Sequence, residues 1–120
     1  MRPPRLLPGL IAVLLLASVN ARAAETPLGP VQAAYLRAET RKADDRFIAQ
    51  VAHLTDSPEA LVRQAMPPEG RITDPALRVM AAIEAQRKIR LSDEVRAQIV
   101  AAEGERRAAI AAARDKARHP

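Results

Sequence analysis

Few side chains in this sequence have the types and spacing that catalysis needs. The 120 residues include no cysteine, so no thiol nucleophile is present. Beyond residue 23 the only serines are Ser57 and Ser92, and each stands where a helix is expected to begin. Capping of a helix N-terminus explains both hydroxyls. The sequence therefore predicts no nucleophile for covalent catalysis.

The sequence also has few residues that could bind a metal or carry out acid–base catalysis. His53 and Asp56 could give two metal ligands, but a site needs three or four and the neighbouring turns supply none. Asp44 and Asp45 are adjacent, so on a helix their carboxylates point about 100° apart and cannot share a proton. We expect no cofactor, no metal and no enzyme activity. A small helical enzyme that uses Arg, Lys and Glu side chains stays as an alternative.

The formal charge of +5, from 19 basic and 14 acidic residues, would suggest a nucleic-acid partner. Three of the arginines lie in the first 23 residues, which hold no acid, so residues 24–120 carry 16 basic and 14 acidic side chains, or +2. That charge is uneven: residues 24–85 carry −2 and residues 86–120 carry +4. Tyr35 and Phe47 are the only aromatic residues available to stack on bases. We therefore expect no nucleic acid among the partners.

The first 23 residues have the pattern of a secretory signal peptide. Arg2 and Arg5 precede an apolar run at residues 6–19, and the small residues around Arg22 predict cleavage between Ala23 and Ala24. The run has 14 residues, short of the roughly 20 that span a membrane, so we expect no stable membrane insertion after cleavage. An exported chain without cysteine is typical of a bacterial envelope, so we predict a periplasmic or secreted protein.

Residues 24–120 predict a single small all-α domain, either a helical hairpin or a bundle of three to four helices. Apolar residues at helical spacing place helices at about 30–54, 58–66, 75–90 and 93–118. Start signals precede each helix, and prolines end the second. The start signals are Gly29-Pro30, Ser57 or Asp56 before Pro58, Asp74-Pro75 and Ser92. Acid–base pairs four residues apart support the helical phase: Glu59 with Arg63, Asp74 with Arg78, Glu84 with Lys88, and Glu103 with Arg107.

Two stretches of these helices have few large apolar residues. Seven of the ten residues from Arg37 to Arg46 are charged, so this part of the first helix is expected to be solvated or to face a polar partner. In the last helix, the apolar seam consists mostly of alanine after Val100, and alanine buries little area. We therefore predict a weakly anchored basic helical arm at about 101–120. A partner that orders this arm and a plain solvated helix are both left open.

A binding role is the function that these features favour. The leading hypothesis is an exported, non-enzymatic interaction protein that binds a protein or another envelope component through helical surfaces, with a homodimer left open. The predicted partner-contact residues are Arg87, Lys88, Arg90, Arg106, Arg107, Ile110 and Arg114. A chaperone-like or stress-related envelope protein is an alternative. The L-T-x-x-Q motif of helical envelope chaperones is not matched at Leu54-Thr55, because Pro58 stands in the place of glutamine.

Overall fold

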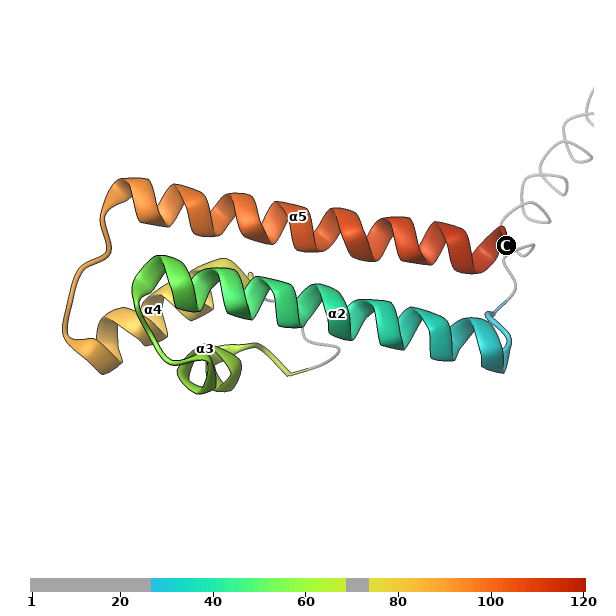
Figure 1. The fold of residues 1–120 in the computed structure, drawn as a ribbon, viewed down its shortest axis with the longest axis horizontal. Coiled ribbons are helices and arrows are strands. Elements are labelled where there is room, and N and C mark those ends of the chain that lie inside the picture. Colours follow the sequence, from blue (N-terminus) through green and yellow to red (C-terminus); the bar gives the residue numbers. More distant parts are fainter. Residues whose placement is uncertain (1–26, 69–73) are drawn as a thin grey trace, which may run out of the picture.

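The computed structural model describes residues 27–68 and 74–120 (Figure 1). These residues form four α-helices: α2 (Pro30–Thr55), α3 (Glu59–Ala65), α4 (Pro75–Arg87) and α5 (Asp93–Arg118). No strand occurs within the two described ranges. The all-α prediction is therefore confirmed. The expected signal peptide and its cleavage site lie outside the described residues.

The two long helices, α2 and α5, run antiparallel and side by side, and α3 and α4 pack under one half of this pair (Figure 1). The large buried side chains lie in that half, which we call the proximal half. They are Phe47, Ile48 and Val51 from α2, Val62 from α3, Val79 and Ile83 from α4, and Ile99 from α5. Complete burial of such a side chain stabilises a fold by about 1.5–3 kcal/mol, so most of the hydrophobic stabilisation arises here.

The other half of the α2–α5 pair, which we call the distal half, is held by small residues. Among the described residues, its buried apolar side chains are Ala43, Ala113 and Ala117. The helix α5 is nevertheless continuous to Arg118. Every residue of the seam expected on α5 is buried or half-buried, and Glu103 is an unexpected charged neighbour that is only 3% exposed. The seam consists of Val95, Ile99, Ala102, Arg106, Ala109, Ile110, Ala113 and Ala117.

The helix boundaries follow local signals, with two corrections. Ser57 and Asp56 do not cap α3. Pro58 occupies the N-cap, while the buried Ser57 hydroxyl accepts a hydrogen bond from Thr55 Oγ1 at 2.9 Å, and Asp56 ends α2 in the left-handed conformation at φ 51°. The Ser92 hydroxyl caps α5 as expected, because it accepts from the Val95 N–H at 3.2 Å.

The second correction is that α4 ends at Arg87, three residues before the predicted end at 90. Lys88 takes the left-handed conformation at φ 53°, which stops the helix. The Glu84 carboxylate then accepts a hydrogen bond from the Leu91 N–H at 2.9 Å, which holds the connection to α5. The Glu84 side chain thus takes the Leu91 N–H, which a continued helix would use for a bond to a backbone carbonyl.

Candidate functional site

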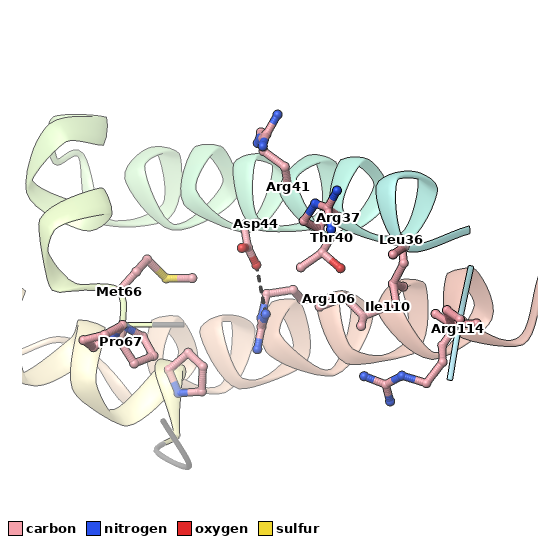
Figure 2. A pocket seen from close by; sticks show the side chains of 14 residues that line it. Leu36, Arg37, Thr40, Arg41, Asp44, Met66, Pro67, Arg106, Ile110 and Arg114 are labelled. Atoms are coloured by element: carbon pink, nitrogen blue, oxygen red, sulfur yellow. Dashed lines mark hydrogen bonds and ion pairs between the residues drawn. The ribbon is translucent and has the colours of Figure 1, made fainter. Parts of the chain in front are cut away.

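A groove of about 670 Å³ lies between the distal halves of α2 and α5 (Figure 2). We call it the α2–α5 groove. Its lining comes from both long helices and from the chain between α3 and α4. The lining residues are Leu28, Ala33, Leu36, Arg37, Thr40, Arg41, Asp44, Met66, Pro67, Pro68, Pro75, Arg106, Ile110 and Arg114.

The groove exists because the short helices cover only part of the α2–α5 pair. The helix α3 ends at Ala65, and Met66 is already extended at ψ 139°. Pro67 and Pro68 cannot continue a helix, and both line one end of the groove. Pro75, the first residue of α4, lines the same end. The groove therefore begins where α4 begins and continues toward the far end of the hairpin.

The floor of the groove is apolar. Leu36 and Ile110 point from the two helices into the space between them, and both are half-buried (Figure 2). Ala33 and Leu28 extend this surface toward the start of α2, and Met66 lies at the opposite end. A ligand lying here would cover half-buried aliphatic side chains, which is favourable at about 25 cal/mol for each Å² of apolar surface removed from water.

One wall of the groove is an ionic cluster centred on Arg106. Its guanidinium binds Glu103 through Nε at 2.6 Å and Nη2 at 3.2 Å, and it reaches Asp44 on α2 through Nη1 at 2.9 Å. Arg107 Nε adds a bond to Glu103 at 3.0 Å. The hydrogen bonds to Glu103, and then those to Asp44, raise the pKa of Arg106 above its ordinary value. Arg106 is therefore a fixed structural cation with its charge matched by two carboxylates.

The other arginines of the groove have no such partners. Within residues 27–68 and 74–120, Arg37, Arg41 and Arg114 make no ion pair or hydrogen bond through their side chains, and all three are exposed. Arg41 and Arg114 extend on opposite sides of the seam between the helices (Figure 2). The described lining residues include four arginines and a single carboxylate, Asp44, which is already bound to Arg106. The groove thus combines an apolar floor with a positive rim that no carboxylate of the described residues neutralises.

The predicted partner-contact residues do not form one surface. Arg106, Ile110 and Arg114 lie in the groove, but Arg107 is directed to Glu103 with 64% of its side chain exposed. Arg87 binds the end of α2, where Nη1 donates to the carbonyl oxygens of Thr55 at 2.6 Å and Asp56 at 2.7 Å. Lys88 and Arg90 are exposed in the connection from α4 to α5, at the opposite end of α5 from Arg114.

The sequence-based site omitted the contribution of α2. The sequence places Arg37 and Arg41 in a charged stretch and predicts an ordinary pair of Arg41 with Asp45, whereas the structure pairs Asp45 with Arg63. The usable signal is that Arg37, Arg41 and Asp44 follow one another at intervals of four and three residues, beside Leu36. That spacing places them on one helix face. A polar partner was one expectation for the charged stretch at 37–46. Part of that partner is α5 of the same chain, because Arg106 binds Asp44.

Of the other candidate chemical groups, His53 and Asp45 lie outside the groove, whereas Asp44 is part of its lining. His53 is exposed, and no cluster of three or more metal-ligating side chains is found among the described residues. Asp44 and Asp45 diverge as expected, since Asp45 instead accepts a bond from Arg63 at 3.0 Å. Of the described helices, none is long and apolar enough to cross a membrane.

No protein-family model, curated protein or solved structure matches this chain.

Proposed function

We propose that this protein is an exported, non-enzymatic interaction protein that binds another component of the bacterial envelope in the α2–α5 groove. The observation that carries the proposal is the pairing of an apolar floor at Leu36 and Ile110 with three arginines that have no acidic partner in the described part of the chain. Interaction sites commonly combine a central apolar surface with a charged rim. Export is proposed from the signal-peptide pattern in residues 1–23.

Binding is favoured over catalysis by the state of the polar groups in the groove. Among the described lining residues, Asp44 is the only carboxylate, and its Oδ1 already accepts a hydrogen bond from Arg106 Nη1 at 2.9 Å. The exposed arginines can bind and orient an anion, but they do not act as bases because they stay protonated. The groove therefore has the groups for recognition rather than for proton transfer.

The proposal is tested by placing a photo-crosslinking amino acid at Ile110 of the full chain and irradiating intact bacteria. Ala108 is a matched control, because it is exposed and lies about 200° around α5 from Ile110. We expect a discrete adduct from position 110, none from position 108, and a weaker adduct when Arg37→Glu and Arg41→Glu are added. Equal labelling at both positions, or an adduct between two copies of this chain, would contradict the proposal.

Export has its own measurement. The mass of the protein isolated from the periplasmic fraction is expected to correspond to a chain that begins at Ala24. A protein that keeps residues 1–23 and stays in the cytoplasm would overturn this part of the proposal.

A further inference from the structure

We infer that the occupant of the α2–α5 groove is an acidic amphipathic helix of a partner protein. This inference rests on the proposed function and names the chemistry of the partner. It follows from the charge of the rim, the spacing of the arginines and the position of the groove relative to α4.

The charge of the rim selects an anionic partner. Arg37, Arg41 and Arg114 are exposed, and the described residues supply no carboxylate to them. An arginine pairs with a carboxylate through two parallel hydrogen bonds, which a neutral partner cannot reproduce at the same strength. Complementary charge also speeds association and disfavours basic partners. The rim therefore favours a ligand that carries several carboxylates.

The spacing of the side chains matches a helix. Arg37 and Arg41 are four residues apart on α2, so they are separated by about 6 Å along the helix axis. Arg106, Ile110 and Arg114 follow at the same interval on α5, over about 12 Å. A helix lying along the groove presents its own residues i, i+4 and i+8 at this repeat. Its acidic side chains can then meet successive arginines, while apolar side chains between them contact Leu36 and Ile110.

The described part of the fold leaves the distal half of the α2–α5 pair open to one more helix. The helices α3 and α4 cover the proximal half of the α2–α5 pair, and the distal half has no covering helix among the described residues (Figure 1). Pro75, the first residue of α4, lines the end of the groove, so a bound helix would continue the layer that α4 begins. Docking of an amphipathic helix into an apolar groove is a recurrent mode of recognition.

The inference is tested with a defined probe. We would use a fluorescent, end-blocked peptide of about 18 residues, long enough to form helix, with a leucine stripe flanked on both sides by glutamates. A second peptide replaces every glutamate by glutamine. Fluorescence anisotropy with the protein purified from cells that express the full chain gives the affinity of each peptide. Vesicles of phosphatidylglycerol serve as the second probe.

We expect the glutamate peptide to bind. The affinity of the glutamine peptide should be lower by about tenfold or more. The double variant Arg37→Glu, Arg41→Glu should lose affinity by about tenfold or more, and Arg114→Glu alone should lose a smaller part of it. The control Lys88→Glu, Arg90→Glu makes the same charge change away from the groove and should stay within about twofold. Affinity should fall as NaCl rises from about 50 to about 300 mM, because the rim is exposed.

Folding does not confound this comparison, because the side chains of Arg37, Arg41 and Arg114 make no ion pair or hydrogen bond with the described residues that the substitutions would remove. Equal affinity for both peptides, or equal losses in the groove and control variants, would overturn the inference. Vesicle binding that depends on Arg37 and Arg41, with no peptide binding, would also overturn it in favour of a lipid.

If the Ile110 adduct forms in cells but the acidic peptide does not bind, the proposed function stands and this inference fails. If the peptide binds but no adduct forms, the proposed function fails.

Discussion

The most unusual residue of the helix interface is Glu103. Its side chain is 4% exposed, and the buried residues nearest to it on α5 are Ile99 and Ala102. A buried carboxylate is costly unless its oxygens are bonded, and here two arginines of the same helix bind them. Arg106 also reaches Asp44 on α2, so the cluster links the two long helices where apolar contacts are small.

We predict that the two arginines of this cluster differ strongly in their contribution to stability. Arg106→Met leaves the buried carboxylate of Glu103 with one partner and leaves Asp44 unpaired, so it should lower the free energy of unfolding by about 2 kcal/mol. Arg107→Met removes a largely exposed pair and should cost at most about 0.5 kcal/mol. Urea unfolding followed by circular dichroism measures both values. Losses of equal size would show that Glu103 does not depend on Arg106 in this way.

The elements are joined by side chains that bind distant backbone groups. Arg87, at the end of α4, donates to the carbonyl oxygens of Thr55 and Asp56, which end α2, and to the Ser57 hydroxyl at 3.3 Å. The cation thereby binds carbonyls that have no partner in their own helix and lies at the negative end of the helix dipole. One side chain fixes the turn between α2 and α3 against α4.

Removal of this contact should destabilise the whole bundle. We expect Arg87→Ala to lower the free energy of unfolding by about 1–2 kcal/mol, because hydrogen bonds that involve a charged group contribute about this amount. Arg87→Lys keeps the charge but not the planar donor group, so it should recover only part of the loss. Chemical unfolding of the three proteins measures the difference. A melt of Arg87→Ala that coincides with the wild type would contradict the prediction.

The connection from α4 to α5 should make stability depend on acid. The hydrogen bond from the Leu91 N–H, and then the interaction with Arg96 at 3.0 Å, lower the pKa of Glu84 below its ordinary value of 4.5. Between the unfolded and folded pKa values the unfolded chain binds more protons, so this stabilisation is complete above pH 4.5 and is lost as the pH falls below it.

We predict that Glu84→Gln flattens this acid dependence. Its free energy of unfolding should fall less steeply than that of the wild type as the pH drops below 4.5, in urea titrations at a series of pH values. Glu105→Gln removes the same charge at an exposed position of α5 and serves as the control. If the free energy of unfolding of Glu84→Gln falls with pH as steeply as that of the wild type, Glu84 is not a source of the acid dependence.

The sequence predicted the elements well because their signals are local. Proline in the first turn at Pro30 and Pro75, and the Ser92 cap, act through residues no more than four positions away. Long-range partners were not predictable in this way. Arg63 was expected to bind Glu59 on its own helix, but it binds Asp45 on α2, and Glu84 binds Arg96 rather than Lys88. Of the expected pairs, Glu103 with Arg107 forms.

The candidate site was predictable only in part for the same reason. The charge and the alanine content of α5 directed attention to Arg106, Ile110 and Arg114, which line the groove. Arg37 and Arg41 line the same groove from the opposite helix, and that relation depends on the register between α2 and α5. The register is visible in the Asp44–Arg106 contact, across 62 residues of sequence. No local pattern specifies a pairing over such a separation.

At the scale of the whole molecule, the large buried side chains and the proposed binding groove are separated along the long axis of the hairpin. The proximal half contains the large buried side chains, whereas the distal half contains the groove and small residues. Local opening requires less free energy where little apolar area is buried. The sequence predicts a weakly anchored arm in the last helix alone. The structure extends this prediction to both helices of the distal half, the beginning of α2 as well as the end of α5.

Hydrogen exchange should reveal this asymmetry. We predict that amides at 36–42 and 104–110 exchange faster than those at 46–52 and 96–102, measured by mass spectrometry of proteolytic peptides. Fraying from the helix ends cannot produce this order. Residues 36–42 are at least six positions from the start of α2, whereas 46–52 come within three positions of its end, and the same relation holds in α5. Faster exchange at 36–42 and 104–110 must then come from weaker packing across the α2–α5 pair.

Addition of the acidic helical peptide should slow exchange in those two segments, because a bound helix supplies the apolar contacts that the distal half lacks. Uniform exchange along both helices would contradict the separation of stability from recognition.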